Sequence, residues 1–86
     1  MTGGRLDRWL FHARFYRTRS LAQAATEAGR VRLNGARVVK CGHAVRCGDV
    51  LTLRSGTQIL VVRILALAER RGGAPQARNL YEILEN

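Results

Sequence analysis

The apolar residues near the start of the chain repeat with the period of an α-helix. Four of them stand at positions i, i+3, i+4 and i+7: Leu6, Trp9, Leu10 and Ala13. That spacing puts them on one stripe of a helix. The polar side of the same helix holds Arg5, Arg8 and His12. The pattern predicts a first helix that ends around Phe15-Tyr16.

A second helix is predicted directly after the first. Thr18 is a good N-cap, because its hydroxyl can accept a hydrogen bond from an amide of the first turn. The apolar positions of this segment repeat the helical spacing: Leu21, Ala24, Ala25 and Ala28. Gly29 supplies the left-handed residue that ends many helices. Because alanine side chains are small, we expect the two helices to pack closely.

The stretch from Gly29 to Val39 alternates apolar and basic residues around Asn34-Gly35. Both central residues of a type I′ turn need positive φ, which Asn-Gly provides well. The turn pairs Arg32 with Arg37 and collects the apolar residues on one face: Val31, Leu33, Ala36 and Val38. The other face holds Arg30, Arg32 and Arg37. Like charges opposite each other destabilise a sheet, so the hairpin predicts an anionic partner.

Two further strands are predicted after the hairpin. A turn at Gly48-Asp49 precedes a strand from Val50 to Arg54. A second turn at Ser55-Gly56 leads into a more apolar strand of about ten residues, bounded as strands usually are by turn residues. The segment from 43 to 49 is predicted as loop and turn.

The end of the chain predicts a short helix that docks on the sheet. Pro75 stands near its start, and its apolar side is expected to contain Leu80, Tyr81 and Leu84. The whole pattern predicts one α+β domain over 1–86: two packed N-terminal helices on a small antiparallel sheet with a β-hairpin, and a short C-terminal helix. The length of 86 residues agrees with a single domain.

The net charge of +9 is concentrated in the first two-thirds of the chain. Residues 1–54 hold ten arginines and one lysine against three acidic residues, a net +8, whereas residues 55–86 hold four arginines against three, a net +1. Arginine can bind phosphate with two parallel hydrogen bonds, which lysine cannot. A polyanion such as nucleic acid is therefore the expected partner, bound by the first two-thirds.

The sequence holds few groups that could carry other chemistry. Cys41, His43 and Cys47 form a C-x-H-x3-C pattern of zinc-ligand types, but a closed site needs a fourth ligand. The other histidine, His12, is on the first helix, so we favour free thiols in a reducing cytoplasm and predict no metal and no cofactor. The six acidic residues are isolated among arginines. We predict that the protein is not an enzyme, and the longest apolar run is too short to span a membrane.

The basic residues, in contrast, are expected to converge. Arg5 and Arg8 line one helix face, Arg14 and Arg17 flank the bend, and Arg19 lies in the first turn of the second helix. The free amides and the dipole of that helix N-terminus favour an anion. The hairpin arginines and Lys40 extend the surface.

Many spaced positions resemble, in order, the RNA-binding domain named after ribosomal small-subunit protein S-four, also called the αL motif. They are Arg5-Leu6-Asp7, Leu10, Thr18-Arg19-Ser20, Ala22, Gly29, Val31, Asn34-Gly35, Val45 and Gly48-Asp49. This resemblance covers 5–54, and 55–86 forms a strand and C-terminal extension. The stretches "RWLFHARFYRTRSLA" and "ALAERRGGAPQARNLYE" are also similar to the small bacterial heat-shock protein fifteen family.

The resemblance implies RNA bound across the helix pair and the hairpin. The implied contact residues are Arg5, Arg8, Arg14, Arg17, Thr18, Arg19, Ser20, Arg30, Arg32, Asn34, Arg37 and Lys40. It also implies association with ribosomal RNA on free large subunits that carry a nascent chain on tRNA, and their rescue after heat stress. Many members have proline and a small residue where this chain has Cys41-Gly42, so the course of that loop is open.

Other functions remain open at this stage. The chain could be the RNA-binding domain of a modifying enzyme such as a pseudouridine synthase, or a DNA-binding nucleoid protein. A protein-interaction module would leave the +8 of residues 1–54 unexplained. We expect a cytoplasmic monomer that binds ribosomal RNA and the large subunit, with tRNA as a further partner, only weak DNA binding and no membrane partner.

Overall fold

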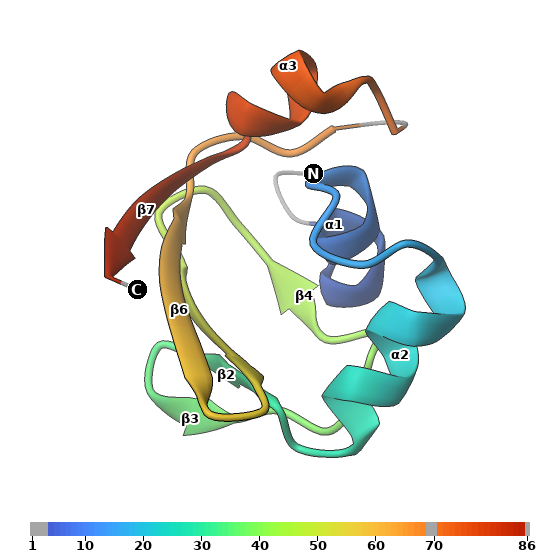
Figure 1. Ribbon diagram of the computed structural model, residues 1–86, viewed down its shortest axis with the longest axis vertical. Coiled ribbons are helices and arrows are strands. Elements are labelled where there is room, and N and C mark those ends of the chain that lie inside the picture. The colour runs from blue at the N-terminus through green and yellow to red at the C-terminus, as the bar shows by residue number, and fades with distance from the viewer. Residues whose placement is uncertain (1–3, 69–70, 86) are drawn as a thin grey trace.

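The computed structural model describes residues 4–68 and 71–85. Its elements are, in order, β1 (Gly4–Arg5), α1 (Leu6–His12), α2 (Arg19–Glu27), β2 (Val31–Leu33), β3 (Ala36–Arg37), β4 (Ala44–Val45), β5 (Val50–Ser55), β6 (Gln58–Ile64), α3 (Ala74–Arg78) and β7 (Tyr81–Glu85). Five strands form an antiparallel sheet in the order β3-β2-β5-β6-β7, and β1 pairs with β4. Helices α1 and α2 lie beside one face of the large sheet (Figure 1). The predicted α+β fold is confirmed.

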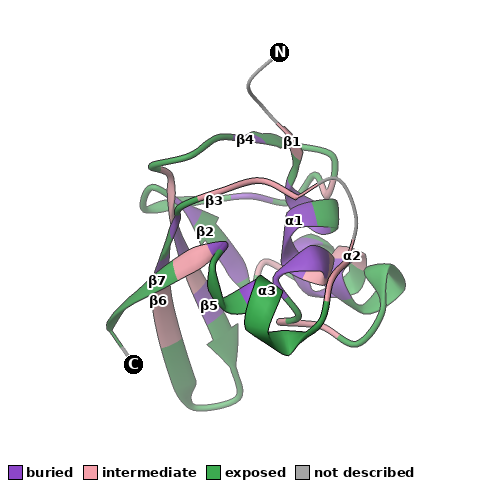
Figure 2. Ribbon diagram, turned by 90° about the horizontal axis from the view of Figure 1, so that it is seen from above, coloured by how far each residue is buried: buried purple, intermediate pink, exposed green. Residues whose placement is uncertain are grey.

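The core lies between α1 and the inner face of the large sheet. Leu6 and Leu10 of α1 are completely buried, as are Leu51, Val62 and Ile64 of the sheet. Figure 2 shows these buried segments facing one another, with exposed residues on the outer sides. The alternation along β2 and β5 follows from this contact, because successive strand residues point to opposite faces. None of the described helices has the length and hydropathy needed to cross a bilayer.

Helix α1 ends earlier than the sequence pattern predicts. The amide of Arg14 donates to the carbonyl of Phe11 (3.0 Å), and that of Phe15 donates to Leu10 (3.1 Å). These two bonds form a Schellman motif, in which Arg14 adopts the left-handed conformation (φ 64°) that glycine usually takes. The ring of Phe15 packs on Trp9 of α1, with centroids 5.8 Å apart. The apolar pattern extends beyond the last residue of the helix because Phe15, which follows the helix, packs back against Trp9.

Helix α2 begins and ends as predicted, but with a different buried face. The Thr18 hydroxyl accepts from the Leu21 amide at 3.1 Å, and Gly29 ends the helix with φ 78°. Its buried residues are Ala22, Ala25 and Thr26. The predicted stripe of Leu21, Ala24, Ala25 and Ala28 is therefore wrong except for Ala25, since the other three side chains are exposed. Small residues face α1, which turns the larger Leu21 to solvent.

The hairpin has the predicted turn and register. Asn34 and Gly35 both have positive φ (51° and 87°), and the pairs are Arg32 with Arg37 and Leu33 with Ala36. Val31, Leu33 and Val38 are buried. Ala36 is exposed, contrary to the predicted apolar face, because the tip of the hairpin extends beyond the core.

The later strands differ from the prediction in three places. The turn after β5 falls at Gly56-Thr57, because Ser55 pairs with Gln58, and β6 has 7 residues. The segment predicted as loop contains β4, which pairs with β1. Residues 81–85 form β7 rather than helix. Strand β6 would otherwise be an unpaired sheet edge, and pairing with β7 satisfies its backbone groups.

The described segments 65–68 and 71–73, which we call the strap, fasten the C-terminal part to α1. The indole of Trp9 donates to the carbonyl of Ala66 (3.0 Å), and His12 Nδ1 lies 3.1 Å from the carbonyl of Ala68. Because a carbonyl only accepts, Nδ1 carries the proton. Arg71 donates to the carbonyls of Phe11 and Tyr16. His12 is thus buried, and its predicted place on the polar side is wrong, because the strap covers that side of α1.

The buried His12 makes stability depend on pH. Burial lowers the pKa of His12 below its usual 6.5, and the charges of Arg8, Arg19 and Arg71 lower it further, against the hydrogen bond to Ala68. Below about pH 6.5 the unfolded chain therefore binds more protons than the folded protein, so stability falls with falling pH. We expect the melting temperature of the wild type to drop between pH 7.5 and 5.5, and that of His12→Gln to drop less. Equal slopes would contradict this.

Candidate nucleic-acid interface

A buried carboxylate organises the arginines of the two helices. Asp7, in the first turn of α1, has a completely buried side chain. It accepts hydrogen bonds from Arg5 (Nε, 3.1 Å; Nη2, 3.3 Å) and from the amide of Arg8 (2.8 Å). Gln23 of α2 donates to it at 2.8 Å, and Arg19 Nη2 lies 3.6 Å away in an ion pair. One carboxylate thus joins α1 and α2 and holds two guanidinium groups.

The protonation state of Asp7 follows from the hydrogen bonds that its carboxylate accepts. Burial by itself would raise the pKa of Asp7, but the hydrogen bonds from Arg5, Gln23 and the Arg8 amide hold that pKa below its usual value. The same contact raises the pKa of Arg5. The side chains of Arg5 and Arg19 are 51% and 46% exposed. Each guanidinium therefore has one side fixed by Asp7 and another side open to a ligand.

The loop of residues 40–43 closes the start of α1 next to Arg5. Its carbonyls at Cys41 and His43 accept from the amides of Asp7 (3.0 Å) and Leu6 (2.9 Å). A Cβ at Gly42 would lie 3.3 Å from the Arg5 guanidinium carbon, so a larger residue would have to displace Arg5. The two backbone hydrogen bonds define the course of the loop at Cys41-Gly42, which the sequence left open. Lys40 is exposed at its beginning.

A second group of arginines lies on the hairpin and the sheet. We call Arg30, Arg32, Arg37 and Arg54 the sheet arginines; all four are exposed. Arg32 pairs with Arg37 on one side and with Thr52 of β5 on the other. The amide of Arg54, two residues further along β5, donates to the carbonyl of Arg30 at 2.9 Å. We call Arg5, Arg8 and Arg19 the helix arginines.

Helix α2 connects the two groups. Arg19 is its first residue and Arg30 follows its end. The guanidinium of Arg37 packs against Gly29, where a Cβ would come within 2.7 Å of the Arg37 Cζ. Gly29 is therefore favoured by its positive φ, a Cβ there would displace the Arg37 guanidinium, and Arg37 is placed near the negative end of the helix dipole. Nine helical residues span about 14 Å, so Arg19 and Gly29 stand at opposite ends of an element of that length.

Some predicted contact residues also have structural roles. Arg14 donates to the carbonyl of Gly72 (3.0 Å) and so points to the C-terminal strap. The hydroxyl of Thr18 is used in the helix cap. The amide group of Asn34 bonds with Asp49 (3.2 Å) and with the amide of Val50 (2.9 Å), which ties the hairpin to β5. Arg17 and Ser20 are exposed near the start of α2.

Sequence reasoning missed four residues that matter here. Nothing in the sequence distinguishes Asp7 from the other five acidic residues, and nothing links it to Gln23, which lies on another helix. Arg54 could be assigned an outward position from the alternation along β5, but its place beside Arg30 depends on the pairing of β2 with β5. Arg71, whose guanidinium also covers the Phe11 ring at 4.4 Å, lies in a segment with no periodic pattern.

The candidate zinc ligands do not come together. Within the described part of the chain, no group of three or more His, Cys, Asp or Glu side chains could hold a metal ion. Cys41 and Cys47 are free thiols, half-buried and exposed respectively. His43 is exposed, with Nδ1 2.9 Å from the carbonyl of Ala44.

Comparison with known proteins identifies the class to which this fold and surface belong. The S4 domain matches residues 4–51, which is more than half of the chain. The chain therefore belongs to the S4-domain family. The resemblance seen in the sequence is confirmed.

Within that family the chain belongs with heat shock protein 15. It is 45% identical to the Heat shock protein 15 homolog of Haemophilus influenzae over 95% of this chain and 62% of that one, and 45% identical to Heat shock protein 15 of Escherichia coli K12 over 91% and 58%. It spans about three-fifths of the length of these relatives. It is also 36% identical to the RQC P-site tRNA stabilizing factor of Listeria innocua, covering 94% of this chain and 86% of that protein.

A solved structure agrees with this assignment. Heat Shock Protein 15 of Vibrio cholerae, described as trimeric, superimposes with a TM-score of 0.88 at 43% identity, over 94% of this chain and 81% of that one. The trimer is a property of that protein, and the monomeric state expected for this chain stays a prediction.

The central role of Asp7 can be tested by removing its charge. Asp7→Asn leaves Arg5 and Arg19 without their ion pair, so we expect the free energy of unfolding to fall by about 1.5–3 kcal/mol, the usual value of hydrogen bonds to a charged group. We also expect weaker binding of structured RNA, although the variant is more positive. Chemical denaturation and a binding titration measure the two effects.

The matched control for this variant is Glu27→Gln, an equal charge change at an exposed position of α2. It should keep its stability and bind RNA at least as well as the wild type. If Asp7→Asn lost stability but bound RNA like Glu27→Gln, Asp7 would be structural only.

Proposed function

We propose that this protein binds structured RNA of the large ribosomal subunit through the helix arginines and the sheet arginines, without catalysing a reaction. The observation that carries the proposal is the buried Asp7 carboxylate with Arg5 and Arg19 fixed around it. A guanidinium that is held in place loses less conformational entropy when it binds phosphate, because its rotamer is already selected. The surface is therefore prepared for an anionic partner.

The geometry favours recognition of backbone and shape over recognition of sequence. The two arginine groups stand at opposite ends of α2, so one folded RNA could contact both. Folded RNA helices are recognised mostly by phosphate and 2′-hydroxyl contacts, because their deep groove is inaccessible to side chains. The opposed pair Arg32 and Arg37 supports the same reading, since phosphate between two guanidinium groups relieves their repulsion.

The names of the relatives support a place on the ribosome. One relative is called a P-site tRNA stabilizing factor, and others are heat shock proteins. We propose that the protein acts on free large subunits that carry a nascent chain on tRNA, where ribosomal RNA is its main ligand and tRNA a second one. This would place it in the cytoplasm and in the rescue of such subunits after heat stress.

A binding experiment with purified particles tests the proposal. We expect the protein to sediment with free large subunits rather than small ones, and large-subunit RNA to outcompete duplex DNA of equal length. If about six phosphates are contacted, the logarithm of the affinity should fall against the logarithm of salt concentration with a slope of roughly −4 to −5.

Other outcomes of these experiments would favour one of the alternative functions or reject the arginine surface. Preference for DNA would make the protein a nucleoid component. Tight binding to naked RNA with no binding to subunits would favour a domain that serves an RNA-modifying enzyme. A salt slope near zero would reject the arginine surface as the binding site.

A further inference from the structure

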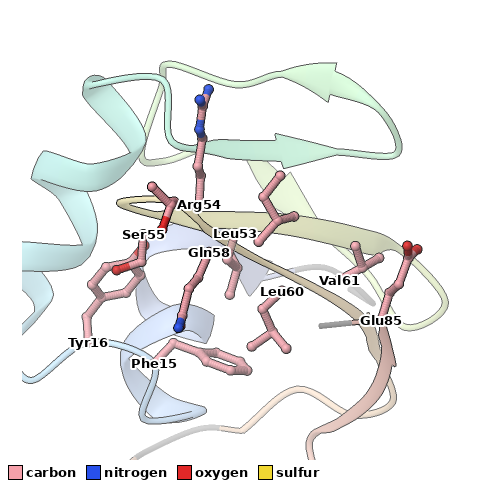
Figure 3. A pocket seen from close by; sticks show the side chains of 11 residues that line it. Phe15, Tyr16, Leu53, Arg54, Ser55, Gln58, Leu60, Val61 and Glu85 are labelled. Carbon is pink, nitrogen blue, oxygen red and sulfur yellow. The ribbon is translucent and has the colours of Figure 1, made fainter.

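A half-open cavity lies next to the arginine surface and shares Arg54 with it. It occupies about 800 Å³ between the Phe15-Tyr16 turn and the end of the β5–β6 hairpin. Figure 3 shows the rings of Phe15 and Tyr16 on one side and Leu53 and Leu60 beside them. The volume is within the range of roughly 300–1,000 Å³ that small-molecule sites occupy.

The walls of this cavity are rigid where they are aromatic. Phe15 is held between Trp9 and Tyr81, with ring centroids 5.8 Å and 4.7 Å away. The backbone of Tyr16 is fixed by Arg71, which donates to its carbonyl at 3.4 Å. The Tyr16 side chain is only half-buried, so part of its ring is open to a ligand.

The polar groups of the cavity suit the edge of a planar heterocycle. The exposed side chain of Gln58 reaches toward Phe15 and Tyr16 (Figure 3), and its amide can both donate and accept. Glu85 also lines the cavity, at the end away from Tyr16 (Figure 3), and its carboxylate adds a negative charge there. That negative charge disfavours a phosphate inside the cavity. An uncharged, flat group with hydrogen-bonding edges suits the cavity better.

The cavity is continuous with the sheet arginines. Arg54 contributes to its lining, but the guanidinium projects away from the cavity toward the β2–β3 hairpin (Figure 3). The charge of Arg30 is close enough to act on the Tyr16 hydroxyl, where it opposes the rise in pKa that burial causes. A nucleic-acid backbone on Arg30 and Arg54 would therefore pass the mouth of the cavity.

We propose that this cavity receives one unpaired, extruded base of the bound RNA, stacked on Tyr16 with its edge on Gln58, while the adjoining phosphates lie on Arg30 and Arg54. The inference rests on the proposed RNA-binding function and adds a preference for RNA helices interrupted by an unpaired nucleotide. Single-stranded bulges and loops are the parts of RNA whose bases proteins stack on aromatic side chains.

The experiment compares two RNA hairpins that differ only at a single-nucleotide bulge. One hairpin carries 2-aminopurine at the bulge and the other an abasic nucleotide, so the number of phosphates is the same. We expect the wild type to bind the base-containing hairpin about tenfold more tightly, as one base–aromatic stack provides, and to change the 2-aminopurine fluorescence. Tyr16→Ala should abolish the preference, and Tyr16→Phe should keep it.

Matched variants separate the possible reasons for a loss. Gln58→Ala, at an exposed position, should reduce the preference even if Tyr16→Ala folds poorly. Leu65→Ala, which removes a half-exposed apolar side chain outside the cavity, should leave it unchanged. Arg32→Glu should weaken binding of both hairpins equally.

Two negative results have different meanings. If the wild type bound both hairpins equally and neither Tyr16→Ala nor Gln58→Ala changed their ratio, the cavity would not be a base site, although the RNA-binding function would stand. If the wild type bound neither hairpin, the proposed function and this inference would both be wrong.

Discussion

The structure depends most on the bonds to the buried carboxylate of Asp7. A charge removed from water must be compensated, and here the compensation comes from two separate segments: Arg5 before α1, and Gln23 and Arg19 of α2. The loop before β4 closes the same place, because its carbonyls accept the amides of Leu6 and Asp7. The acid therefore sets how the two helices sit against each other and which way two arginines face.

The ion pairs with Asp7 reduce two free-energy costs of a strongly basic binding surface. Arginines placed together repel one another, and a flexible guanidinium loses entropy when it binds. Asp7 offsets the repulsion between Arg5 and Arg19 and restricts their motion, but leaves about half of each side chain exposed. Among the residues that the structure describes, no acidic side chain forms an ion pair with the sheet arginines. Arg37 instead packs on Gly29 at the end of α2, and Arg32 stays opposite it, so a bound anion would relieve their repulsion.

Features that follow from a few neighbouring residues could be predicted from the sequence. The Asn34-Gly35 turn, the Thr18 cap and the Gly29 stop depend on local φ preferences and local hydrogen bonds, and all three are confirmed. Features that depend on distant partners could not. The buried face of α2 depends on how α2 packs against α1. Residues of β7 form a strand because they pair with β6. His12 is buried by a strap that lies more than fifty residues away in the sequence. In the same way, the arginines were recognisable, whereas Asp7 and Gln23 that position them were not.

The most direct test of this account is to observe the arginine side chains during RNA binding. In an NMR titration with large-subunit RNA, the Nε–Hε signals of Arg5, Arg19, Arg32 and Arg37 should shift together at low RNA concentration. Those of Arg63, paired with Glu82 at 3.6 Å, and of Arg78 on α3 should stay in place. Equal shifts of all arginines, or shifts confined to Arg63 and Arg78, would contradict the claim that an Asp7-anchored surface binds the RNA.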